Sequence, residues 1–176
     1  MRDIELHEDL ETAATLRAII CVEGPDEYPY AETIERTSAK LSAETVLVSA
    51  DAPGDRAAMV NALRTALHLD HGPQPRSLAD AEDSIVAERA RAPRLVVVFD
   101  AHALRTTALV TLYGMWAHLV PSRFGLVLTG PHRKLERTLE RPALASLQSC
   151  VHLHPDFPLR SDASPLHLLL AGARHG

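Results

Sequence analysis

Short apolar runs alternate with longer amphipathic segments along the whole chain. The runs are rich in β-branched residues and end at a glycine or a polar residue, as buried parallel strands do. The last run instead alternates apolar and polar positions, like a half-exposed edge strand. Strands are expected at 18–24, 44–50, 94–100, 124–130 and 150–155.

The segments between these runs have helical spacing. In one of them, Met59, Leu63, Ala66 and Leu67 form a single apolar stripe. In the next, Ser77 and Asp80 have the spacing of a capping box after a Gly/Pro-rich loop at 71–76. Helices are expected at 7–17, 29–41, 52–69, 77–91, 104–119, within the charged stretch 131–149 with a break near Pro142, and in the tail at 162–172.

Five strands that alternate with helices predict an α/β fold with a parallel sheet covered on both faces. The chain has 176 residues, 46% hydrophobic and 23% charged, which is typical of a globular domain and excludes general disorder. We expect one domain over 1–176, with an N-terminal helix (1–17), a core (18–160) and a short tail (161–176).

Net charge and cysteine content indicate which classes of protein this chain is unlike. The net charge of −5 disfavours a chain whose whole surface binds nucleic acid, although residues 123–176 are net basic. Cys21 and Cys150 are expected to be free thiols, and no secretory signal or membrane span is apparent, so we expect a cytoplasmic protein. Only Lys40 and Lys134 are lysines among 18 basic residues, a bias typical of GC-rich bacterial genomes.

The chemistry-bearing residues are expected beyond the carboxyl ends of the strands, where open parallel sheets bind ligands. The clearest feature there is the run VVVFDAH, in which Asp100 follows an apolar strand. P-loop NTPases hold Mg²⁺ with such an aspartate. A loop-capping role for Asp100 is the plain alternative.

Several segments in order resemble the AAA+ ATPases, particularly the small bacterial type that assists transposases. The matching pieces are IICVEGP, LVVVFDAHAL, FGLVLTG and RPALAS, within about 15–160. The resemblance implies a P-loop NTPase sheet in the order 5-1-4-3-2, with Asp100, His102 and Thr129 beside the nucleotide site. It also implies a helical lid, for which the tail after Pro158 is too short.

The expected phosphate-binding loop departs from the working pattern Gly-x-x-x-x-Gly-Lys-Ser/Thr. Proline takes the place of the second glycine, tyrosine that of the lysine and alanine that of the Mg²⁺-binding hydroxyl, and two acids stand where phosphates need donors. The aligned residues are Gly24, Pro25, Asp26, Glu27, Tyr28, Pro29, Tyr30 and Ala31.

Two further family positions are altered. Ala101 stands where the family has the glutamate that activates water, and alanine has no group to do this. Leu147 stands where the family supplies an arginine to a neighbouring subunit, a role open to Arg137 or Arg141. We therefore expect no catalytic residue, and no cofactor, at this site.

Other candidates carry alternatives. His152 and His154 form half of a metal site at most, His102 is a possible general base, and Ser49 and Ser146 lack a nucleophile context. Tyr113, Met115 and Trp116 are expected in the core, with a partner surface as the alternative. The basic stretch 123–141 suits DNA phosphates, an acidic partner or a salt-bridged helix with Glu136 and Glu140; its cations are Arg123, Arg133, Lys134, Arg137 and Arg141.

The sequence thus predicts a catalytically inactive AAA+-like protein that acts as a scaffold or regulator through protein contacts. Its partner would be a competent AAA+ relative or a transposase-like protein. The alternative is an accessory protein of DNA transposition or recombination that binds ATP with Mg²⁺, hydrolyses it weakly and contacts DNA through residues 123–141.

Overall fold

The computed structural model describes residues 2–25, 30–49, 54–89, 94–118 and 124–153. The strands are β1 (Ile19–Gly24), β2 (Glu44–Ser49), β3 (Arg94–Phe99), β4 (Gly125–Pro131) and β5 (Val151–Leu153). The α-helices are α1 (Arg2–Leu16), α2 (Tyr30–Ser38), α3 (Arg56–Ala66), α4 (Leu78–Arg89), α5 (Thr106–His118), α6 (Lys134–Leu139) and α7 (Ala145–Ser149). Short 3₁₀ turns are η1 (Leu69–His71), η2 (Ala101–Ala103) and η3 (Pro142–Leu144).

The strands form one parallel sheet in the order β2-β3-β4-β1-β5. The four long strands are therefore ordered β1-β4-β3-β2, with β4 between β1 and β3. The last strand differs in extent from the range 150–155 predicted for it: β5 has three residues and pairs with β1 only at Ile19 and Ile20. Residues beyond Leu153 lie outside the described part of the chain, as does the helix expected in the tail.

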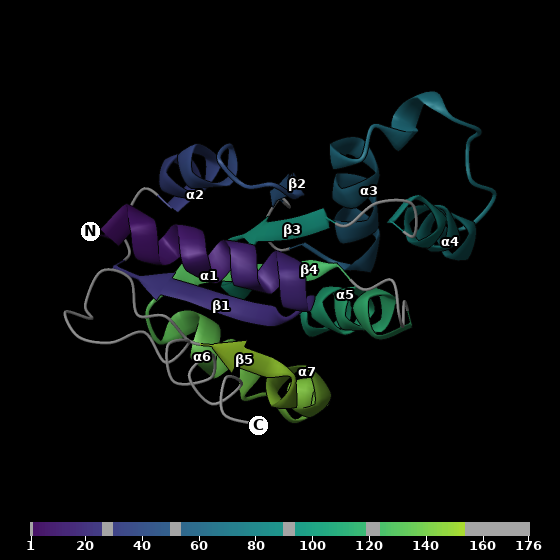
Figure 1. Ribbon diagram of the computed structural model, residues 1–176. Coiled ribbons are helices and arrows are strands. Elements are labelled where there is room, and N and C mark those ends of the chain that lie inside the picture. Colours follow the sequence, from purple (N-terminus) through teal and green to yellow (C-terminus); the bar gives the residue numbers. More distant parts are fainter. Residues whose placement is uncertain (1, 26–29, 50–53, 90–93, 119–123, 154–176) are drawn as a thin grey trace, which may run out of the picture.

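Helices cover both faces of this sheet, so the predicted α/β architecture is confirmed. Alternate residues of β1 enter different clusters: Ile19 and Cys21 pack with α3, α5, α6 and α7, whereas Ile20 and Val22 pack with α1 and α2. Figure 1 shows α1 lying along one face of the sheet, with α2 beside it. This period-two division explains why the strands are apolar at successive positions.

Two helices begin later than the sequence predicted. Helix α3 begins at Arg56 because the Asp55 carboxylate accepts a hydrogen bond from the Ala58 N–H and caps it. The helix expected to start at Leu104 starts later, because Leu104 is the extended C-cap residue of η2 and the Arg105 N–H donates to the Gly54 carbonyl at 2.9 Å. Helix α5 therefore begins at Thr106.

The charged stretch after β4 is helical and broken at Pro142, as predicted. It forms α6, then η3 with Pro142 at its start, then α7. The capping box is confirmed in part: the Asp80 N–H donates to Ser77 Oγ at 3.1 Å, but the Asp80 carboxylate accepts from the Arg76 N–H rather than from that of Ser77.

The aromatic region of α5 lies in the core. Trp116 is buried and donates from Nε1 to the Phe124 carbonyl at 3.0 Å, and its ring stacks on Tyr113 with centroids 5.9 Å apart. Met115 is buried in the same cluster. Core packing is therefore the role of these side chains in the described structure.

Candidate functional site

Three connections meet at the carboxyl edge of the sheet. Gly24 ends β1 opposite Pro131, the last residue of β4. The His132 N–H donates to the Gly24 carbonyl at 2.7 Å, which joins the two strand ends. The loop that begins at Asp100 follows β3, the next strand along.

The β1–α2 connection enters its helix without a lysine. Tyr30 is the first residue of α2, Ala31 is exposed beside it, and the first turn carries the acid Glu32. Lys40 is exposed two residues past the end of α2, about 15 Å from Tyr30 at the rise of a helix. Gly24 is buried and Pro25 is exposed, whereas Asp26, Glu27, Tyr28 and Pro29 lie outside the described residues.

Asp100 turns the chain out of β3. Its backbone is in the left-handed region (φ 52°, ψ 37°), and its carbonyl accepts from the Ala103 N–H at 2.8 Å. The side chain of Asp100 is 68% exposed, whereas Ala101 is fully buried in the core cluster. The edge of the sheet thus presents one solvated carboxylate followed by a residue that faces the core.

His102 lies between this turn and β4. Its Nδ1 is 4.0 Å from Asp100 Oδ1, which is too long for a hydrogen bond, and no other described residue provides a partner for that buried atom. The ring packs on Gly130, where an added Cβ would be 3.2 Å from His102 Nδ1. Thr138 Oγ1, from α6, donates to the His102 carbonyl at 3.3 Å. His102 is therefore a packing residue between η2, β4 and α6.

Thr129 does not join this group. It is buried and pairs with Val22, and the alternation along β4 places its side chain on the α1–α2 face. Gly130, the next residue, faces His102 on the other side of the sheet. The structure therefore brings Gly24, Asp100 and His102 to one edge but points Thr129 away from them.

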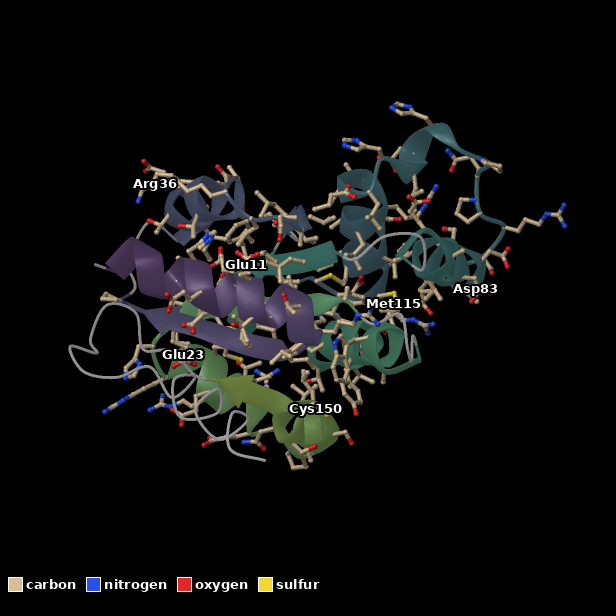
Figure 2. The ribbon with its side chains drawn as sticks, in the orientation of Figure 1. Glu11, Glu23, Arg36, Asp83, Met115 and Cys150 are labelled. Atoms are coloured by element: carbon tan, nitrogen blue, oxygen red, sulfur yellow. The ribbon has the colours of Figure 1, made fainter. Side chains whose placement is uncertain are left out.

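Glu23 is the residue that sequence reasoning missed. It is 5% exposed, and its carboxylate accepts hydrogen bonds from the Glu136 N–H at 2.9 Å and the Arg133 N–H at 3.4 Å. His132 Nδ1 lies 3.5 Å from the same carboxylate. Figure 2 labels Glu23 where β1 approaches α6. In the sequence, Glu23 is recognisable only as a single acid inside an apolar strand. Its partners lie more than a hundred residues away, so the sequence does not indicate them.

Both cysteines are free thiols in the structure. Burial raises the pKa of the Cys21 thiol well above its ordinary value, and the negative charge of Glu23 raises it further. Cys21 is thus a neutral core residue. Cys150 is half-buried, with its Sγ 3.8 Å from the Tyr113 hydroxyl.

The predicted basic stretch places its described cations on the surface. Arg133, Lys134, Arg137 and Arg141 are all exposed, and Arg123 lies outside the described residues. Arg141 Nη1 donates to Thr106 Oγ1 at 3.2 Å, so the end of this stretch contacts the start of α5. Leu147, which the resemblance aligns with the family's arginine, is buried in α7 and lies in the core.

The remaining candidates do not converge. Ser49 and Ser146 are exposed at separate places, His152 lies in β5, and His154 falls outside the described residues. Within the described ranges, no three His, Cys, Asp or Glu side chains are grouped to hold a metal ion. None of the helices in the described part of the chain has the length and apolar content that a membrane span requires.

Comparison with known proteins establishes the fold. No protein-family model matches the chain, and a search of curated proteins finds no significant match. Among solved structures, Cdc6p from Pyrobaculum aerophilum is similar over 97% of this chain (TM-score 0.63, 16% identity), and Orc1 from Aeropyrum pernix in complex with DNA over 98% (0.62, 17%). Drosophila ORC bound to AT-rich DNA and Cdc6 is similar over 97% (0.55, 13%).

These likenesses concern architecture. The chain spans 48% of each of the two archaeal proteins and 64% of the Drosophila chain. The shared feature is an α/β fold with a parallel sheet, which in this chain has its four long strands in the order β1-β4-β3-β2. The chain therefore has the fold of the AAA+ P-loop NTPases.

Proposed function

We propose that this chain is an AAA+-like module that neither binds ATP at working concentrations nor hydrolyses it, and that acts as a scaffold or regulator of a protein partner. The observation that carries the proposal is the β1–α2 connection. It enters α2 through Tyr30 and Ala31 with Glu32 in the first turn, so the helix presents an acid where a phosphate needs a cation.

The neighbouring connection does not replace the missing donors. The backbone N–H groups of Arg133 and Glu136 at the start of α6 already bond the buried carboxylate of Glu23. A phosphate would have to displace that carboxylate and leave it buried without partners, which is costly. The two amides are therefore committed to holding the fold together.

The chemistry of hydrolysis is also incomplete. Asp100 is exposed and suited to a metal-bound water, but the adjacent Ala101 is buried and has no base. A glutamate at position 101 would place a carboxylate in the core cluster, at a cost of several kcal/mol. The packing of η2 against β4 and α6 thus disfavours a carboxylate base at position 101.

The partner class rests on the fold. Two of the similar structures are complexes, Orc1 with DNA and ORC with DNA and Cdc6. A chain that has this fold but neither binds nor hydrolyses ATP would act by binding other macromolecules through its surface. The expected partner is a competent AAA+ relative or a transposase-like protein.

Titration calorimetry with ATP and Mg²⁺, together with a phosphate-release assay, tests the proposal. We expect a Kd in the millimolar range or weaker, because each lost ion contact of about 1.4 kcal/mol weakens binding tenfold. We also expect no turnover, and no rescue by Tyr30→Lys, since Ala101 remains. Turnover that disappears in Asp100→Ala would overturn the proposal. Micromolar ATP binding without turnover would contradict the proposed lack of ATP binding, and it would favour a role as a nucleotide sensor.

A further inference from the structure

The charges after β4 alternate in sequence but separate in space. Residues three and four apart share a side of a helix. Lys134 and Arg137 are related in this way within α6, whereas Arg133 directly precedes the helix and Arg141 follows its C-cap residue Glu140. Glu136 and Glu140 share a different side, between the buried Leu135 and Leu139 side and the arginines. The acids therefore border the cations instead of interrupting them.

The tertiary fold brings the start of α5 beside this row, through the contact of Arg141 with Thr106. Arg141 Nη1 bonds Thr106 Oγ1 at 3.2 Å, and the exposed Arg105 immediately precedes Thr106. Arg105 is itself held by its N–H bond to the Gly54 carbonyl. We call the resulting surface the basic ridge; it consists of Arg105, Arg133, Lys134, Arg137 and Arg141.

The orientation of the ridge is fixed by the core. Leu135 and Leu139 anchor α6 in the core cluster, and Glu23 holds its first turn against β1. In the described chain, Arg137 makes no ion pair with Glu136 or Glu140. Among the described residues its guanidinium therefore has no partner, and it stands on a helix that the core holds in place.

We infer that the basic ridge binds the phosphate backbone of a nucleic acid, without reading its sequence. Helix α6 spans six residues, about 9 Å at the helical rise, and Arg133 and Arg141 flank it, a length that matches about three phosphates along one strand of a duplex. Arginine provides a planar group with paired donors that suits phosphate oxygens. The inference goes beyond the proposed function and does not depend on nucleotide chemistry.

An acidic protein surface is the competing ligand, and the ridge fits it less well. Acidic side chains on a folded protein are irregularly spaced, whereas phosphates form a continuous line, as the cations of the ridge do. The bordering Glu136 and Glu140 would weaken both kinds of complex by like-charge repulsion. Neutralising these two acids should therefore strengthen binding, whereas neutralising the arginines should weaken it.

The experiment measures fluorescence anisotropy of a labelled 20-base-pair duplex of arbitrary sequence with the full chain, between about 50 and 200 mM salt. We expect log K to fall linearly with log salt, with a slope of about −3 to −4. Arg137→Gln with Arg141→Gln should weaken binding at least tenfold at the low salt and reduce the slope by about two. Glu136→Gln with Glu140→Gln should tighten binding.

The matched control is Lys40→Gln with Arg76→Gln, which removes two exposed cations far from α6 in sequence. It should leave the affinity within about twofold. Absence of duplex binding at the low salt, an equal loss in the control, or tighter binding of poly-glutamate than of the duplex would each overturn the inference. ATP titrations on the same variants keep this result separate from that of the proposed function.

Discussion

The β1–α2 and β4–α6 connections begin alike and end differently. Each leaves a buried strand at the carboxyl edge of the sheet, and the two strand ends, Gly24 and Pro131, are paired. The first connection enters its helix with an acid in the first turn and no cation. The second enters α6 with Arg133 and Lys134, and its first amides bond the carboxylate of Glu23.

This difference shows that the fold and the chemistry of a phosphate site are separable. The sheet order and the edge are retained, while the cations stand on the neighbouring connection. The side chains of Arg133 and Lys134 are exposed there, while backbone N–H groups at the start of α6 bond the buried carboxylate of Glu23. Of the two helix starts, that of α2 carries an exposed acid and that of α6 carries exposed cations.

The largest expected effect is the loss of Glu23. Glu23→Ala removes the acceptor of two N–H groups at a buried helix start, which should lower the free energy of unfolding by about 3 kcal/mol. Urea denaturation measures it. The matched variant Glu32→Ala, in the exposed first turn of α2, should change stability by about 0.5 kcal/mol or less. Equal effects at the two sites would remove the distinction between the connections.

An intermediate effect is expected for thiol labelling. Cys21 lies two residues before Glu23, and burial together with that carboxylate raises its pKa, so little thiolate exists in the folded protein. Near pH 8, Cys21 should react with a thiol reagent at least about 100-fold more slowly than the half-buried Cys150. Mass spectrometry of the labelled peptides gives both rates. Comparable rates would mean that the end of β1 opens readily.

The smallest effect concerns the contact between β4 and η2. Gly130→Ala would place a Cβ 3.2 Å from His102 Nδ1 and 3.3 Å from Leu135 Cβ, which should cost about 1 kcal/mol. Gly114→Ala, in α5 with no atom within 4 Å of the new Cβ, should instead stabilise by about 0.5–1 kcal/mol. Thermal denaturation of the two variants measures the difference. Stabilisation by both would show that His102 does not pack against β4 as described.

Much of the fold was predictable because local patterns encode it. Apolar runs identified the five strands, and helical spacing and capping residues located most helices. The absence of a lysine at the start of α2 could also be seen directly in the sequence. The boundaries were less predictable: α3 and α5 begin late because Asp55 caps one and the Arg105–Gly54 bond delays the other.

The sequence by itself determined which chemical groups the chain has: no lysine at the start of α2, an alanine after Asp100, and a basic stretch after β4. Only the tertiary structure decided where they act. It placed Glu23 on the first turn of α6, turned Thr129 to the opposite face, buried Ala101 and brought Arg141 to Thr106. These outcomes depend on strand pairing and on contacts between residues distant in sequence, which no local pattern encodes.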